Sequence, residues 1–316
     1  MEIGKKVLML VSVIIIGFAM STTSIYAGDV SVSGFADLVY TITDEKIPVD
    51  PNNERAFTID GEVDFMADRG PVSVRLDLDI NKGAPTAETP LTVEQVFFSL
   101  PVGMVTVTGG KFNTLIGFEG PDAPGLLQTS YGQLGGPLGT AGALGLTGVM
   151  VTGKMGMAEV DVFVKQTKGD FGAQVRLAPF EGVGLSVGYV QTADVVGVDA
   201  LDILDVIATW KGDTAVGALL VAGEYVDDDE LSGWGIWVNT TQGPYGLTLR
   251  YDSLDCDLAG PNCLVVPVTS TTMTVAGSYA VNDNLSTILE WYTLDPNDSV
   301  AGDDTDLVTL EAIVTF

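Results

Sequence analysis

The sequence has 316 residues, a formal net charge of −28 at pH 7 and no histidine. The lack of histidine excludes His-based acid–base catalysis, histidine-activated nucleophiles and most zinc sites, so we do not expect an enzyme. The acidity excludes a nucleic-acid partner, because a phosphate backbone demands a basic surface. Disorder is not expected either, because 46% of the residues are hydrophobic and these are regularly spaced.

The first 27 residues predict a secretory signal peptide. Lys5 and Lys6 give a positive start, residues 7–19 are apolar, and small residues lead to Ala27, where cleavage is expected. The apolar core is too short for a membrane-spanning helix. We therefore predict a signal peptide over 1–27 and a single folded unit over 28–316.

From Val30 onward the sequence is a succession of runs in which apolar and polar residues alternate. A period of two predicts β-strands with one apolar and one polar face. The clearest run is 72–81, where every even position up to 80 is apolar and every odd position is polar. We predict about 16 strands, most of them long enough to span an outer membrane, which takes ~9–11 tilted residues. They lie near 30–43, 57–65, 72–81, 91–100, 102–111, 144–153, 157–166, 171–178, 183–191, 201–211, 214–226, 231–240, 245–253, 270–281, 285–294 and 306–316.

The connections between these runs alternate in length. Short, turn-rich connections are expected at 68–71, 101–103, 154–156, 179–182, 211–213, 242–244 and 281–284. The connections between them are mostly longer: 44–55, 81–90, 112–143, 192–200, 227–232, 254–269 and 295–305. Short turns on one rim and long loops on the other are typical of outer-membrane barrels. A sheet in hydrocarbon must also close, because no water satisfies an open edge.

The sequence therefore predicts an all-β fold: a closed antiparallel transmembrane β-barrel with short periplasmic turns and long extracellular loops. The location expected is the outer membrane of a Gram-negative-type bacterium. The last run ends on the aromatic Phe316, and such an ending resembles the signal by which outer-membrane barrels are recognised for insertion. Aromatics on the apolar parity near strand ends indicate interface girdles. They are Tyr189, Trp210, Tyr225, Trp234, Tyr245, Tyr251, Tyr279 and Trp291.

Charged residues occupy the polar parity of many strands and must face water, because burying an unpaired charge is costly. The residues predicted to line a pore are Asp60, Glu62, Asp64, Arg75, Asp77, Asp79, Arg176, Arg250, Asp252 and Glu290. The same parity turns Asp37, Glu159, Asp161, Lys165, Asp205, Lys211 and Glu311 inward. An excess of acids over bases in a narrow pore favours cations. In the alternative interpretation, these charges only hydrate and cross-link the wall.

The longest connection, 112–143, is rich in Gly, Pro and Leu and contains Glu119 and Asp122. A structureless loop of this length needs a reason. Its position after the fifth strand resembles that of the loop that narrows the channel of 16-stranded diffusion porins. We therefore predict a pore constriction carrying Glu119 and Asp122, with an external lid as the alternative. Just before it, Lys111 has the lipid-facing parity, so either a bulge at 109–110 turns it inward or its side chain snorkels.

Residues 110–119 read Gly-Lys-Phe-Asn-Thr-Leu-Ile-Gly-Phe-Glu. This stretch is similar to one in β-barrel porins of the OmpL-like type, where Gly-Lys-Phe runs into a Pro-Ile-Gly-Tyr-Glu-like turn. Leu115 and Phe118 stand where proline and tyrosine are usual. The resemblance implies a passive channel, with no catalytic residue and no cofactor.

Cys256 and Cys263 are close in sequence in a chain that we expect to be exported. They predict one small disulfide loop on the external side, with a free thiol pair or a metal site left open. The acidic clusters 227–230 and 295–306 lack calcium-loop spacing. They are either solvated or hold divalent cations that bridge lipopolysaccharide.

The function predicted is that of an outer-membrane porin for passive diffusion of small hydrophilic solutes or ions, with a preference for cations. Its partners are outer-membrane lipid and lipopolysaccharide, and trimers are common among similar porins. The runner-up is a structural or partner-binding barrel, an adhesin or sheath, with a closed or occupied lumen. A third interpretation is a secreted soluble β-sandwich or surface-layer protein.

Overall fold

The computed structural model describes residues 30–45, 55–80, 91–113, 116–134, 146–165, 171–191, 202–228, 231–256, 269–296 and 305–316. The predicted signal peptide 1–27 and the predicted Cys256–Cys263 pairing lie outside what can be described, so both stay predictions. The strands are β1 (Val30–Glu45), β2 (Arg55–Arg69), β3 (Val72–Ile80), β4 (Leu91–Val102), β5 (Val105–Phe112), β6 (Leu146–Met155), β7 (Ala158–Lys165), β8 (Phe171–Phe180), β9 (Val183–Gln191), β10 (Asp202–Thr214), β11 (Gly217–Asp227), β12 (Leu231–Gln242), β13 (Tyr245–Cys256), β14 (Thr269–Asn282), β15 (Leu285–Pro296) and β16 (Thr305–Thr315). A single 3-10 turn, η1 (Ala123–Gly125), occurs in the described part of the β5–β6 connection.

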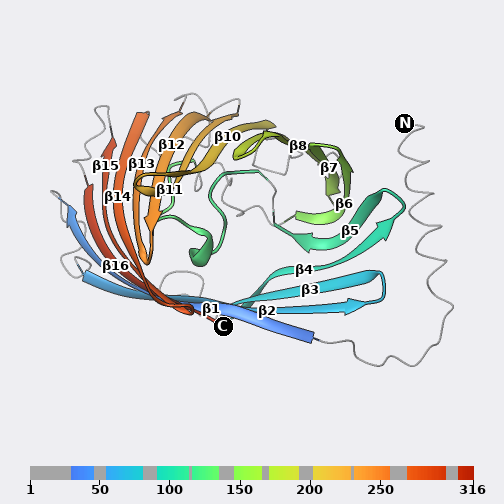
Figure 1. The fold of residues 1–316 in the computed structure, drawn as a ribbon, viewed down its shortest axis with the longest axis horizontal. Coiled ribbons are helices and arrows are strands. Elements are labelled where there is room, and N and C mark those ends of the chain that lie inside the picture. Colours follow the sequence, from blue (N-terminus) through green and yellow to red (C-terminus); the bar gives the residue numbers. More distant parts are fainter. Residues whose placement is uncertain are drawn as a thin grey trace, which may run out of the picture.

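Each strand pairs antiparallel with its sequence neighbours, and β1 pairs with β16 to close the ring (Figure 1). The seam extends to the last residue: the Phe316 amide donates to the Gly34 carbonyl at 3.1 Å, and the Gly34 amide donates to the Phe316 carbonyl at 3.2 Å. The prediction of a closed antiparallel barrel of 16 strands is confirmed. A two-sheet sandwich is excluded, because the described strands form one closed sheet with no free edge.

The two faces of the wall have the polarity predicted from the alternation. On β13, Leu247, Leu249 and Tyr251 are exposed on the outside, whereas Arg250 and Asp252 are buried on the inside. The outer face also carries most of the aromatics expected at the interfaces. Those with exposed side chains are Trp210, Tyr225, Trp234, Tyr245, Tyr251, Tyr279 and Trp291, and Tyr189 is half-buried. The molecule is therefore apolar outside and charged inside, the reverse of a soluble domain.

Seven two-residue turns join alternate strand pairs, at 70–71, 103–104, 156–157, 181–182, 215–216, 243–244 and 283–284. The turn predicted at 211–213 is wrong, because β10 continues to Thr214. Gly212 is there for packing: a Cβ on it would come within 2.7 Å of the Trp210 ring, which lies against it. The connection 227–232, expected to be long, leaves only residues 228–230 between β11 and β12.

A bulge occurs where the sequence did not predict one. In the β3–β4 ladder, Asp77 pairs with Gln95 and Leu78 with Val93, so Glu94 is the extra residue, and Glu94 and Gln95 are both buried. The alternative bulge at 109–110 is wrong, since the β4–β5 register runs without a shift. Lys111 keeps its outward parity and bends back, its Nζ donating to the Val93 carbonyl at 2.6 Å. This agrees with the snorkelling alternative.

No helix in the described part of the chain is long and apolar enough to cross a bilayer.

Candidate functional site

Residues 116–134 lie inside the ring of strands rather than over its mouth (Figure 1). We call them the inner segment. Its backbone is irregular, so its amides need acceptors from the wall. The Gly117 amide donates to Asp205 of β10 at 2.8 Å, and the Phe118 amide donates to Glu224 of β11 at 3.1 Å. The start of the inner segment thus lies against the wall formed by β10 and β11.

Glu119 is the centre of a buried polar network. Arg250 Nη1 and Trp237 Nε1 donate to its Oε1 at 3.1 and 3.0 Å. Gln128 Nε2 donates to the same oxygen at 2.5 Å, and the Gly132 amide donates to Oε2 at 2.7 Å. One carboxylate therefore links both arms of the inner segment to the wall.

Arg250 completes this network from β13. Its Nη1 and Nη2 donate to the carbonyl and hydroxyl of Ser130 at 2.6 and 3.0 Å, and its Nε forms an ion pair with Asp252 at 3.1 Å. The Arg250 side chain is fully buried, as is that of Asp252. A charge so deeply buried is tolerable only because carboxylates and hydrogen bonds surround it.

The returning arm of the inner segment is held by carboxylates of β15 and β16. The Thr129 and Ser130 amides donate to Glu290 at 2.8 and 3.1 Å, and the Thr129 hydroxyl donates to Glu311 at 2.8 Å. Between the two arms lies the tip of the inner segment, residues 120–125. Tyr131 contacts this tip, its hydroxyl donating to the Pro121 carbonyl at 2.5 Å. Partial burial and nearby carboxylates raise the pKa of this phenol, so it stays a hydrogen-bond donor.

Apolar packing fixes both ends of the inner segment. Ile116 and Leu134 are almost fully buried in a cluster formed by inward-facing residues at the strand ends. Two wall glycines make room for them: a Cβ on Gly188 would overlap the Ile116 side chain, and one on Gly233 would overlap that of Leu134. The rest of the cluster comprises Phe112, Leu146, Phe163, Val190, Ile203, Ala222, Val226, Leu231, Trp237 and Leu254.

All ten residues predicted to line a pore come from strands, and they form two separate groups. Glu62, Asp77 and Asp79 are buried, at 2%, 0% and 6% exposed. Arg250, Asp252 and Glu290 are at most 1% exposed, and because they bond to the inner segment they do not line open water. The parity was right, but residues 116–134 occupy the space in front of them. The other group is on β2, β3 and β8, and its Glu62 lies close to Asp122 of the inner segment. It comprises Asp60, Glu62, Asp64, Arg75, Asp77, Asp79 and Arg176.

In the second group, arginines reach into the interior. Arg75 is about one-third exposed and forms ion pairs with Asp77 at 2.7 Å and Asp64 at 3.6 Å. Arg176 is also partly exposed and pairs with Glu159 and, at 2.7 Å, with Asp161. The guanidinium groups of Arg75 and Arg176 are thus partly exposed, whereas the carboxylates of Asp77 and Asp161 are buried.

Sequence reasoning did not select Glu94, Gln95, Glu224 or Trp237, which all contact the inner segment or its root. Gln95 Oε1 accepts from the Asn113 amide at 2.9 Å, and Glu94 Oε1 accepts from Asn113 Nδ2 at 3.0 Å. Strand parity alone could have found Glu224, which alternates with outward Tyr225. Glu94 could not be found in this way, because the bulge reverses the parity.

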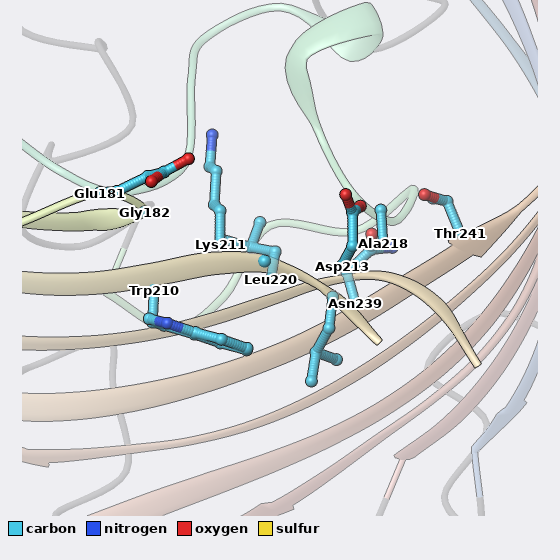
Figure 2. A pocket seen from close by; sticks show the side chains of 11 residues that line it. Glu181, Gly182, Trp210, Lys211, Asp213, Ala218, Leu220, Asn239 and Thr241 are labelled. Carbon is cyan, nitrogen blue, oxygen red and sulfur yellow. The ribbon is translucent and has the colours of Figure 1, made fainter. Parts of the chain in front are cut away.

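A cavity of about 720 Å³ lies at the rim of the two-residue turns. Its lining includes Glu181, Lys211, Asp213, Asn239 and Thr241 (Figure 2). In Figure 2, Lys211 rises from its strand while the neighbouring Trp210 points away along the wall. The charged and amide side chains make this end of the interior suitable for hydrated solutes.

The architecture defined by these observations is that of the 16-stranded outer-membrane porins, with a segment after the fifth strand folded inside. No protein-family model and no curated protein matches the sequence. Solved structures share the fold at low identity. Salmonella typhi OmpF, in a complex with daunomycin, aligns with a TM-score of 0.65 and 12% identity over 93% of this chain and 100% of that one. The outer membrane channel DcaP of Acinetobacter baumannii gives 0.63 and 12% over 92% and 100%, and an anion-selective porin from Comamonas acidovorans gives 0.62 and 13% over 91% and 99%.

Proposed function

We propose that the protein is an outer-membrane channel for passive diffusion of small hydrophilic solutes and ions. The observation that carries the proposal is the polarity of the closed wall: leucines, valines and aromatics outside, carboxylates and arginines inside. An apolar belt of this extent needs a lipid covering. Its partners are then outer-membrane lipid and lipopolysaccharide, and a homotrimer is the assembly we expect by analogy with similar porins.

The inner segment narrows this channel. Its bonds to Asp205, Glu224, Arg250, Glu290 and Glu311 hold it along β10 to β16. The wall from β3 to β8 contributes few of these anchors, and it carries Arg75 and Arg176, whose side chains are partly exposed. Solutes would pass between the inner segment and this wall. The resemblance of residues 110–119 to OmpL-like porins is consistent with this, since that stretch is where the chain turns inside.

We further propose a preference for cations, because carboxylates outnumber basic groups on the inner wall. The fold does not set this property, since one solved structure with the same fold is described as anion-selective. Selectivity must therefore come from individual lumen charges.

Single charge changes beside the proposed path should shift the selectivity in opposite directions. Arg176→Gln should raise the K⁺/Cl⁻ permeability ratio and Glu159→Gln should lower it, each roughly two- to fivefold. The change is modest because pore water and salt screen the interaction between one wall charge and a permeating ion. Reversal potentials of the purified barrel in planar bilayers under a KCl gradient measure this ratio. Arg69→Gln, at the exposed end of β2, is the matched control and should leave the ratio unchanged.

The same recordings test the channel itself. A folded barrel that inserts but gives no conductance steps contradicts the proposed channel and favours the structural or partner-binding alternative, with a closed lumen. Equal reversal potentials for the wild type and both charge variants would show that this wall does not face the permeating ions.

A further inference from the structure

Three carboxylates from separate elements converge where the tip of the inner segment meets the wall. Glu62 comes from β2, Glu94 from the bulge of β4, and Asp122 immediately precedes η1. Each offers an oxygen, and the three oxygens lie within 4.8 Å of one another. Glu62 and Glu94 are buried, and Asp122 is half-buried. The group joins the inner segment to β2 and β4, across the β1–β16 seam from its anchors Glu290 and Glu311.

Glu62 is the residue that points to a ligand. Its side chain is only 2% exposed, yet its Oε2 has no hydrogen-bond partner among the described residues. Buried polar atoms are nearly always satisfied, and an isolated buried carboxylate is costly. Glu62 also belongs to a second group of close carboxylates, with Asp64 and Asp77. An atom that carries a positive charge here would satisfy the orphaned oxygen.

Arg75 supplies a positive charge to the second group only in part. Its ion pairs run to Asp77 at 2.7 Å and to Asp64 at 3.6 Å. Asp64 and Asp77 therefore share one guanidinium, and Glu62 belongs to both groups of carboxylates. A cation bound by Glu62, Glu94 and Asp122 would balance the negative charge that Arg75 does not neutralise.

We propose that Glu62, Glu94 and Asp122 bind a divalent cation of the calcium type, which ties the tip of the inner segment to the wall. Carboxylate oxygens are the ligands that hard cations prefer. Oxygens around Ca²⁺, at 2.3–2.6 Å from the ion, can be separated by up to about 5 Å, whereas around Mg²⁺ the limit is about 4.2 Å. Three oxygens within 4.8 Å of one another fit around Ca²⁺, whose flexible geometry suits carboxylates from three separate elements better than the near-ideal octahedron that Mg²⁺ demands.

A neighbouring cavity gives the ion access and space for water ligands. It measures about 380 Å³, and its lining includes Glu62, Asp64, Asp122 and the tip residues Gly120 and Pro124. Calcium usually takes six to eight oxygens, so water must complete a site built from three carboxylates. Ca²⁺ binding does not depend on the channel function, whereas any change in conductance that the bound ion causes rests on the proposed function.

The test is calorimetric titration of the detergent-purified, chelator-treated barrel with CaCl₂, and with MgCl₂ for comparison. We expect one site with a Kd of about 10⁻⁵ to 10⁻³ M, weaker binding of Mg²⁺, and a rise in the unfolding temperature with Ca²⁺. Glu62→Gln and Asp122→Asn should each weaken Ca²⁺ binding at least about tenfold. Asp227→Asn, at the end of β11 in the acidic cluster 227–230, is the control and should keep the site.

Unchanged Ca²⁺ binding in both Glu62→Gln and Asp122→Asn would place the ion elsewhere and overturn the proposal, as would no binding at all. Heat-modifiable gel migration confirms that each variant is folded. Conductance is measured separately: a barrel that binds Ca²⁺ without conducting contradicts the channel proposal and leaves the ion site intact.

Discussion

Replacing Arg250 with methionine is expected to lower the free energy of unfolding of the barrel by about 3–5 kcal/mol. The change removes three hydrogen bonds to the inner segment and leaves the buried carboxylates of Glu119 and Asp252 without their counter-charge. Methionine keeps much of the side-chain volume, so the loss reports on charge rather than on a cavity. Urea unfolding in detergent, followed by tryptophan fluorescence, measures it.

A double-mutant cycle separates the ion pair from general damage. Glu119→Gln should partly restore stability in the Arg250→Met background, because it removes one of the two charges stranded by the first change. Arg69→Met, at an exposed strand end, should cost little. If Arg250→Met is no more destabilising than Arg69→Met, the network around Glu119 does not stabilise the barrel.

The architecture could be predicted because one simple rule governs it. Every strand that must separate lipid from water repeats with a period of two, and rows such as Arg75, Asp77 and Asp79 can face only one side. Turn positions were less predictable, because a glycine has more than one use. Gly212 resembled a turn residue but lies under the Trp210 ring inside β10.

The site was predictable only in part, because parity tells which way a side chain points and not what lies in front of it. Arg250 and Arg176 have the same inward parity in the sequence. The inner segment covers the first and leaves the second partly exposed. The Glu94 bulge was also hidden, since it depends on a register shift in the β3–β4 ladder rather than on the residue itself. The packing of residues 116–134 determines which inward arginine is covered, and the strand register determines where the bulge lies.

The second large effect is expected from replacing the two wall glycines that contact the ends of the inner segment, Gly188 and Gly233. Gly188→Val and Gly233→Val should each displace an end of the segment, because the new side chain would occupy the space of Ile116 or Leu134. Overpacking of this kind costs about 1–3 kcal/mol. The wall strands are held by their ladders, so the inner segment should yield first. Single-channel conductance in planar bilayers should therefore change, with the double variant showing the largest and noisiest currents.

Gly277→Val is the matched control, since Gly277 is also a strand glycine but is exposed on the outer face, where an added Cβ would meet no atom within 4 Å. It should conduct as the wild type does. Ile116→Ala should rescue Gly188→Val, because the smaller side chain restores the space that the valine takes, but it should not rescue Gly233→Val, whose neighbour is Leu134. Rescue of both variants by Ile116→Ala would mean that the currents follow overall loosening of the segment. Rescue of neither would mean that these contacts do not set its position.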